Sequence, residues 1–451
     1  MSAPSAARSS TISSLLGVWA LFLAFGLLQV GNGLQRILLP MRAESEGFGA
    51  GSMGAVMAVH FAGYLLGAKA IPRALATVGH IRVFAALAST ASTAVLINAV
   101  LVLPASWAAV YFVSGVCNAG VLVILESWLN DRATNETRGS ILGAYMMIMM
   151  GGTAVGQLLL NVGSPDGFEL FVLSSVLISL AVVPVTLSAS TAAPVPTNDK
   201  MPLRELYHTI PSAVVGIILC SFVQSAATSM AAVFGTESGM SPARITLFTS
   251  AAVIGAVTLQ MPLGSLSDHY PRRAVILTVT VISGGLAVVG AFVPASSSML
   301  IVVNLAFGAF VFPLYGQFVA LANDWVPPEK RIAAASTLVL ASSFGAMAAP
   351  MIIGIAVESF GPTAYFWSLA TCLGVLALYL SYRIRVRQAV PIERQSAFQP
   401  VLARSGEIAH SVGKWVLHPL AGWHRHRDDH DSVADERRSR HLTLPTDGGV
   451  D

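Results

Sequence analysis

Two short stretches of the chain carry the same pattern of acidic and basic side chains. Asp131 and Arg138 flank the first stretch, and Asp324 and Arg331 flank the second. Each stretch begins with Asn-Asp and continues with a Glu and then an Arg at matching positions. Carboxylate and guanidinium groups this close together can form ion pairs that tie helix ends together and later separate. The second stretch follows the first by 193 residues throughout, so the pattern predicts an internal repeat.

Long apolar stretches separate these charged clusters. Only 11% of the 451 residues are charged and 54% are hydrophobic, whereas about a quarter are charged in typical soluble domains. Each apolar stretch is long enough to cross a bilayer core of about 30 Å as a helix, so the fold class expected is an all-α membrane protein. The predicted spans are residues 15–39, 49–74, 80–103, 106–131, 139–161, 167–189, 210–236, 243–267, 274–294, 297–322, 332–356 and 362–383.

Basic residues at the ends of these spans predict the orientation in the membrane. With the N-terminus inside, 12 Lys and Arg lie in inner loops or the N-terminus, against Arg36, Arg42 and Arg244 at or near outer loops. Positive charge prefers the cytoplasm, so both termini are predicted to be cytoplasmic. The predicted parts are a cytoplasmic N-terminus (1–14), a six-helix bundle (15–189), a cytoplasmic linker (190–209), a second bundle (210–383) and a largely disordered tail (384–451).

The order of the spans makes the repeat a parallel one. Six spans separate the two copies, so both copies enter the membrane in the same orientation, as in many transporters. The stretch Gly264-Ser-Leu-Ser-Asp-His-Tyr-Pro-Arg-Arg resembles the loop motif of the major facilitator superfamily, a glycine followed by Asp and paired basic residues. Two further stretches, Glu126-Ser-Trp-Leu-Asn-Asp and Gly79-His-Ile-Arg-Val-Phe, resemble the YcaD-like group of bacterial members. The resemblance implies two pseudo-symmetric six-helix bundles with a substrate cavity between them.

The resemblance also implies a cytoplasmic gate at this loop. Asp268 is expected near the cytoplasmic N-terminus of span 11, where free N–H groups and the helix dipole favour an anion, while Gly264 permits close helix approach. The first half departs from the pattern, because Ala76 stands at the acidic position. The other residues assigned to the gate are Arg272, Arg273, Glu126, Asp131, Arg138, Asp324, Arg331, Lys69 and Arg73.

Glu126 lies five residues before the end of the fourth span and is the acidic residue clearly inside a span. Acidic side chains within a membrane are costly and usually functional. We expect Glu126 to pair with Lys69, Arg73 or Arg138 and to replace the missing loop acid; a role as a proton site is the alternative. His60, midway along span 2, could titrate near neutral pH as a second proton site, or make one interhelical hydrogen bond.

Polar residues in spans 1, 4, 7 and 10, which the resemblance implies line the cavity, are the candidates for solute binding. Those within one span share a helix face by their spacing. Buried amides in a membrane need partners, so hydrogen bonding between helices remains equally open for these residues. Arg36 either meets an anionic group or extends to the outer interface. The set is Gln29, Asn32, Arg36, Tyr111, Asn118, Gln224, Thr228, Asn304 and Tyr315.

These features together predict a secondary active transporter in a bacterial inner membrane. It moves a small organic solute by alternating access as a monomer, with protons as the coupling ion. Export is preferred, because glycines in span 5 partly resemble the antiporter motif of the superfamily; metabolite import is the alternative. A transporter-like sensor that binds solute without flux is the rival of another class. No enzyme, cofactor, metal or nucleic-acid partner is predicted, because no acid dyad, His cluster or phosphate-binding glycine loop occurs.

Overall fold

A computed structural model of the protein describes residues 19–132, 138–187, 201–327 and 330–386. In this part of the chain twelve helices are long and apolar enough to cross a membrane. The all-α fold class and the twelve predicted spans are therefore confirmed. The spans are α2 (Trp19–Ser45), α3 (Ala50–Val78), α4 (His80–Val100), α5 (Pro104–Arg132), α6 (Arg138–Leu158) with η1 (Leu159–Val162), α7 (Glu169–Leu180) with α8 (Val182–Leu187), α10 (Pro211–Ser229) with α11 (Ala231–Glu237), α12 (Pro242–Thr258) with α13 (Gln260–His269), α14 (Arg272–Phe292), α15 (Ser298–Val311) with α16 (Pro313–Asn323), α17 (Arg331–Phe360) and α18 (Ala364–Val386).

The end of the first span and the linker differ from the sequence-based expectation. The first span was predicted to end at residue 39, before Pro40, but α2 continues through this proline to Ser45. Arg36 therefore lies well inside a helix instead of beside an outer loop. The predicted linker also contains a short helix, α9 (Leu203–Thr209), while the predicted N-terminus, most of the linker and most of the tail lie outside the described residues.

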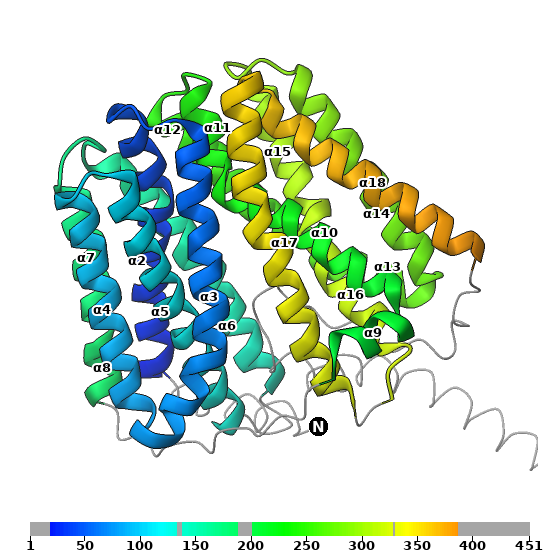
Figure 1. The fold of residues 1–451 in the computed structure, drawn as a ribbon, viewed down its shortest axis with the longest axis horizontal. Coiled ribbons are helices and arrows are strands. Elements are labelled where there is room, and N and C mark those ends of the chain that lie inside the picture. The colour runs from blue at the N-terminus through cyan, green and yellow to red at the C-terminus, as the bar shows by residue number, and fades with distance from the viewer. Residues whose placement is uncertain (1–18, 133–137, 188–200, 328–329, 387–451) are drawn as a thin grey trace, which may run out of the picture.

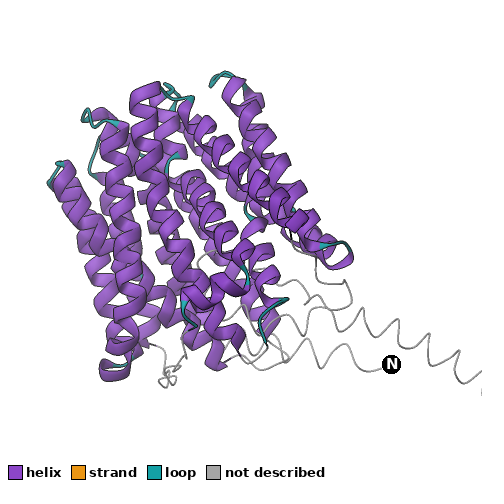
Figure 2. Ribbon diagram, turned by 45° about the vertical axis from the view of Figure 1, so that its right-hand side comes forward, coloured by secondary structure: helices purple, strands orange, loops and turns teal. Residues whose placement is uncertain are grey.

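The two halves use the same helix pairs. In the first half α3 packs on α5, α2 on α6, and α4 on α7; in the second half the equivalent pairs are α12 on α15, α10 on α17, and α14 on α18. The halves lie side by side, with their helices running roughly the same way across the molecule (Figures 1 and 2). The parallel repeat predicted from the charged stretches is thus visible in the packing.

Glycines allow the closest of these helix crossings. Gly63 and Gly115 lie at the α3–α5 crossing, and Gly255 and Gly308 lie at the α12–α15 crossing. A side chain at any of the four would overlap a backbone carbonyl of the facing helix. Small residues of this kind let membrane helices approach until their backbones touch. The carbonyls concerned belong to Phe112, His60, Leu305 and Ala252, respectively.

The halves meet each other mainly at one face of the membrane. We call this the far face; at the opposite, terminal face α2 begins at Trp19 and α18 ends at Val386. Near the far face α3 packs on α17, with Gly54 against the carbonyl of Pro350 and Gly354 against that of Ala50. The backbone N–H of Gly51 also donates to the Glu358 carboxylate at 2.9 Å.

A second pair of helices also joins the two halves near the far face. Gln157 of α6 accepts a hydrogen bond from Ser250 of α12 at 3.0 Å, and α11 packs on α2. Towards the terminal face α3 and α17 diverge (Figure 1). The backbones of α3 and α17 therefore lie farther apart at the terminal face than at the far face.

We expect Gly308→Val to destabilise the second half, because the new side chain collides with the Ala252 carbonyl. Overpacking of this kind costs about 1–3 kcal/mol, and backbone cannot move aside as a flexible side chain can. Gly374→Val is the matched control, since a side chain at Gly374 meets open space. Thermal unfolding of the purified variants in detergent tests this; equal melting temperatures for the two variants would contradict it.

Candidate functional site

A cavity of about 140 Å³ lies between the two halves. We call it the central cavity. The first half contributes residues from α2, α3, α5 and α6, and the second half contributes residues from α10, α12 and α17 together with Phe312. The lining residues are Gln29, Arg36, Phe61, Tyr64, Asn118, Leu122, Met149, Met150, Thr153, Ser221, Gln224, Ser225, Thr228, Val253, Ala256, Phe312, Val339, Ser342, Ser343 and Ala346.

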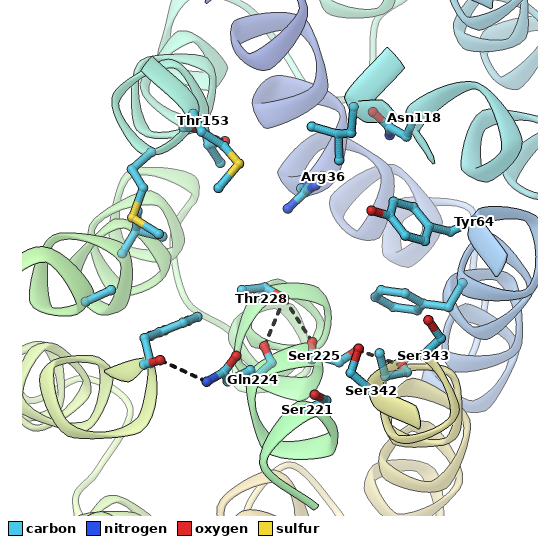
Figure 3. A pocket seen from close by; sticks show the side chains of 18 of the residues that line it. Arg36, Tyr64, Asn118, Thr153, Ser221, Gln224, Ser225, Thr228, Ser342 and Ser343 are labelled. Carbon is cyan, nitrogen blue, oxygen red and sulfur yellow. Dashed lines mark hydrogen bonds between the residues drawn. The ribbon is translucent and has the colours of Figure 1, made fainter. Parts of the chain in front are cut away.

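The two walls of the central cavity differ in chemistry. Arg36 projects from the first half into the space between the halves (Figure 3). Opposite it, α10 and α17 present hydroxyl and amide groups, including Gln224, Ser225 and Ser342. No acidic residue occurs among the described residues that line the cavity. The site therefore offers one positive charge, several hydrogen-bonding groups and an apolar surface.

A smaller cavity of about 40 Å³ adjoins the central cavity and is lined mostly by residues of the first half. We call it the side chamber. Arg36, Phe61, Asn118 and Thr228 line both spaces, so the two are continuous at these side chains. The other residues that line the side chamber are Asn32, Gln35, Met57, His60, Tyr111, Ser114 and Ser229.

Polar side chains of α2 and α10 occupy equivalent places in the repeat. The glycine contacts align α2 with α10 at a spacing of 192 residues, because Gly152 meets Gly26 as Gly345 meets Ile218. At this spacing the polar residues of one helix match those of the other. The matched pairs are Gln29 with Ser221, Asn32 with Gln224, and Arg36 with Thr228.

One of these pairs makes the same contact in both halves. Asn32 donates through Nδ2 to the Oδ1 atom of Asn118 in α5, at 3.0 Å. Gln224 donates through Nε2 to the carbonyl oxygen of Val311, at 3.1 Å, and Val311 follows Asn118 by 193 residues. Each half thus joins its first helix to its fourth by an amide beside the cavity.

The structure places seven of the nine predicted cavity residues at one of these two spaces. Gln29, Arg36, Asn118, Gln224 and Thr228 line the central cavity. Two others, Asn32 and Tyr111, line the side chamber.

Asn304 and Tyr315 line neither space. Asn304 donates from Nδ2 to the carbonyl oxygen of Phe248 at 2.7 Å, which links α15 to α12. Tyr315 is buried in α16. Asn304 therefore holds two helices together, which was the alternative left open for the whole set.

The structure describes the side chains of two of the three partners predicted for Glu126, namely Lys69 and Arg73. The side chain of Glu126 is buried, 8% exposed, and accepts a hydrogen bond from the hydroxyl of Tyr145 in α6, at 3.4 Å. Lys69 and Arg73 are exposed, and the described residues contain no ion pair between either of them and Glu126. The side chains of Asp131 and Arg138 lie outside the described residues.

His60 lies at the side chamber. Its Nδ1 atom is 3.2 Å from the carbonyl oxygen of Tyr111. Because a carbonyl oxygen only accepts, the Nδ1 atom carries the proton in this contact.

The loop motif of the second half forms a buried ion-pair cluster. Arg272 donates to Asp324 at 2.7 Å and to Asp268 at 3.1 Å. The side chains of Arg272 and Asp324 are each 1% exposed, so the cluster is shielded from solvent. Arg273 lies over the ring of Trp325, with its guanidinium carbon 5.6 Å from the ring centre. These contacts join the start of α14 to the end of α16.

Two other predicted gate residues flank this cluster. Gly264 is buried in α13, whose contacts are with α12, α14 and α16. Arg331 donates from Nε to the carbonyl oxygen of Val326, at 3.3 Å. The gate residues of the second half therefore gather around the ends of α13, α16 and α17.

The helix pairs show which helices meet across the interface near the Asp268 loop. Span 11 (α17) packs across the interface on span 2 (α3), whereas span 8 (α12) packs across it on span 5 (α6). Asp268 belongs to α13, the continuation of span 8. The helix of the other half that packs beside α12 is thus α6.

Comparison with known proteins gives the same fold and shows which family the chain is similar to. The model of the Major Facilitator Superfamily matches residues 213–424. An MFS-type transporter of Yersinia enterocolitica is 27% identical over 285 residues, which is 62% of this chain and 72% of the relative. The MFS-type transporter YcaD of Escherichia coli O9:H4 (strain HS) is 24% identical over 361 residues, 78% of this chain and 92% of the relative. The second half of the chain thus resembles the Major Facilitator Superfamily, and its relatives are MFS-type transporters.

Solved structures of this superfamily share the fold. The nucleoside transporter NupG, crystallised as a mutant, is similar with a TM-score of 0.69 at 13% identity, over 81% of this chain and 99% of that one. A bacterial homolog of the human lysosomal transporter Spinster, in an inward-facing and occupied conformation, is similar with a TM-score of 0.69 at 16% identity, over 84% and 97%. The predicted resemblance to the superfamily and its YcaD-like group is confirmed, and these proteins are transporters, not enzymes.

Several cavity residues escaped the sequence analysis. Tyr64 of α3, Thr153 of α6 and Ser342 and Ser343 of α17 line the central cavity, but they lie outside the four spans considered. The available signal was the run of polar residues in α10, where Ser221 and Ser225 share a face with Gln224 and Thr228. The same periodicity in spans 2, 5 and 11 would have extended the search to them.

We expect Asp324→Asn to destabilise the protein, because it leaves the buried Arg272 with one carboxylate fewer. Breaking a buried ion pair costs about 3–5 kcal/mol, and the remaining contact with Asp268 places the expected loss at the lower end. Glu205→Gln is the control, since the Glu205–Lys330 pair is exposed and worth about 0–1 kcal/mol. Thermal unfolding in detergent is the measurement; an unchanged melting temperature for Asp324→Asn would show that the cluster is not structural.

Proposed function

We propose that this protein is a proton-coupled carrier that moves a small organic solute through the central cavity by alternating access. It acts as a monomer in a bacterial inner membrane, with both termini in the cytoplasm. The observation that carries the proposal is the central cavity itself, whose walls come from both halves. A solute bound there is exposed to one side or the other as the halves rock.

The contacts between the halves support an inward-open arrangement. They are concentrated at the far face, where α3 packs on α17 and α6 packs on α12. The positive-inside rule assigns the terminal face to the cytoplasm. With that orientation the cavity faces the cytoplasm, and transport requires a second state that is closed on that side.

The gate of that second state involves Asp268 and the start of α6. Because α12 and α6 pack across the interface, rocking of the halves brings the end of α13 towards the start of α6. The N–H groups and dipole of a helix start stabilise a carboxylate. The Arg272–Asp324 pair holds the loop in place for this contact.

Glu126 is the proposed proton site. Its carboxyl group is buried next to Tyr145, and a charged carboxylate at that depth is costly unless it is paired or protonated. Protonation of Glu126 would remove this cost, and loss of the proton would restore it, as the halves move. His60 is the second candidate, because it lines the side chamber.

Export is the proposed direction and import is the alternative. Export follows from the partial likeness of the glycines of α6 to an antiporter motif. Gly152 and Gly156 also pack directly against α2, so helix packing explains the same residues. Flux measurements must therefore decide the direction.

We expect proteoliposomes containing the protein to move solutes from a panel of small organic compounds and dyes in response to an imposed pH gradient. Glu126→Gln should lower this gradient-driven flux at least tenfold while leaving exchange of solute for solute, because exchange needs no net proton movement. Glu205→Gln, an exposed acid, is the control. Wild-type gradient dependence in Glu126→Gln would remove Glu126 as the proton site, and binding without flux under any gradient would favour a receptor.

We expect Asp268→Asn to slow transport without weakening solute binding, since Asp268 does not line either cavity. The turnover number should fall while the dissociation constant stays within about twofold, as expected for a residue that acts on the conformational step. Asp166→Asn, in an exposed loop at the far face, is the matched control. Equal loss of binding and flux would place Asp268 in the binding site instead.

A further inference from the structure

The side chamber contains two buried polar side chains whose hydrogen-bonding groups are unused. Gln35 is 6% exposed and Ser114 is 7% exposed, and both line the chamber. The Nε2 atom of Gln35 and the Oγ atom of Ser114 have no hydrogen-bond partner among the described residues. Leaving such a group unpaired costs about 1–3 kcal/mol, so each of them points to a polar group that enters the chamber.

Neighbouring polar groups in the chamber already have partners. Asn32 is bonded to Asn118, and His60 is bonded through Nδ1 to the carbonyl of Tyr111. They hold α2, α3 and α5 together around the chamber and keep its shape. The Gln35 amide and the Ser114 hydroxyl are thus buried donors that a ligand can use, and they line the chamber together with Arg36.

Charge decides what kind of polar group fits. Arg36 lines both the chamber and the central cavity, and no acidic residue lines either space among the described residues. In a membrane interior of low dielectric constant a guanidinium group strongly favours an anion. A carboxylate accepts from a guanidinium, an amide and a hydroxyl at once. One positive charge matches a monoanion better than a phosphate, which carries about −1.5 to −2 near neutral pH.

The sizes of the two spaces agree with this division. A water-sized group needs about 10–15 Å³ of cavity volume. The side chamber, at about 40 Å³, therefore holds a group of the size of a carboxylate. The central cavity of about 140 Å³ holds a body of roughly ten non-hydrogen atoms by the same measure. Phe61, Leu122, Met149 and Met150 give it an apolar wall beside the chamber.

Resting on the proposed function, we propose that the side chamber binds the carboxylate of the solute and that the substrates are small amphipathic monocarboxylic acids. Arg36 pairs with the carboxylate at the mouth of the chamber, Gln35 and Ser114 donate to it from within, and the apolar body lies in the central cavity. These three side chains of the first half therefore favour the ionised acid over a neutral molecule.

The test compares acids with their neutral amides. Phenylacetate, benzoate and octanoate, and the corresponding amides, are titrated into the purified full-length protein in nanodiscs by calorimetry. At least one acid is expected to bind tenfold or more tightly than its amide. Arg36→Gln should remove this preference, and Arg36→Lys should retain part of it. Arg42→Gln is the matched control, because Arg42 lies six residues further along the same helix and pairs with Glu46 at the surface.

A second variant keeps the test decisive if Arg36→Gln does not fold. Ser114→Ala removes one donor without removing charge and should weaken binding of the acid about tenfold, as for a hydrogen bond to a charged group. Binding of the amide should change far less. An unchanged dissociation constant for the acid in Ser114→Ala and Arg36→Lys, or no preference for any acid over its amide, would overturn the proposal.

Counterflow in proteoliposomes separates this proposal from the transporter proposal. Movement of acids and amides alike would overturn the carboxylate site and leave the carrier intact. Tight, Arg36-dependent binding of acids without movement of any compound would overturn the carrier and leave the carboxylate site. Movement of acids that fails in Arg36→Gln and persists in Arg42→Gln would support both.

Discussion

Contact between the backbones of neighbouring helices is the constraint on which this structure depends. Lipid chains are as apolar as leucine, so burying apolar side chains does not by itself drive helices together in a membrane. Close packing and hydrogen bonds must do so, and both require short distances between helices. Gly63 and Gly115 in one half, and Gly255 and Gly308 in the other, provide these distances. Polar side chains can then reach the next helix, as Asn32 reaches Asn118.

The same kind of contact is used between the halves, but over a shorter length. Gly54 and Gly354 bring α3 and α17 together near the far face, and the two helices diverge beyond that point (Figure 1). Within each half the pairs are joined at several levels by glycines and hydrogen bonds. Each half is therefore expected to move as a unit, and the contacts at the far face are those that must separate when the cavity opens on that side.

Much of this architecture could be predicted from the sequence, because it depends on patterns that can be read directly along the chain. Twelve apolar stretches and a shift of 193 residues gave the spans and the repeat. The direction of each polar side chain was harder to predict. The spacing of Asn304 and Thr228 predicts that both face inward. In the structure Asn304 donates a hydrogen bond to the carbonyl oxygen of Phe248, whereas Thr228 lines the cavity. Spacing on one helix cannot decide this, because it depends on where the neighbouring helix approaches.

Two positions show a further limit of sequence reasoning. Arg36 was placed near an outer loop because the first span was expected to end at residue 39, yet α2 continues through Pro40 to Ser45. Gln29 both lines the central cavity and donates to the carbonyl of Met149 at 3.4 Å. Lining a cavity and joining helices are therefore not exclusive roles. One amide can do both when it lies beside the cavity at the point where two helices cross.

The residues proposed to act in transport lie where the two copies of the repeat differ. At a spacing of 192 or 193 residues, Arg36 corresponds to Thr228, Glu126 to Val319, and Asp268 to Ala76. The glycines that set the helix crossings are matched between the copies instead. A shared scaffold needs the same backbone contacts in both halves, because the same helix pairs must form. A carrier needs one charge at its solute and one titratable acid, so these groups are expected once rather than twice.

The buried arginines of the two halves illustrate this division of roles. Arg272 is satisfied by Asp268 and Asp324 of its own half, so its charge is balanced within the fold and holds α14 to α16. Arg36 lies beside a cavity that no acidic residue lines among the described residues. A guanidinium held by carboxylates of its own half stabilises structure, whereas one that lines a cavity can also meet an anion that enters it. This place beside the cavity is the physical reason to look for an acidic solute, and it makes Arg36 the side chain whose removal should change selectivity.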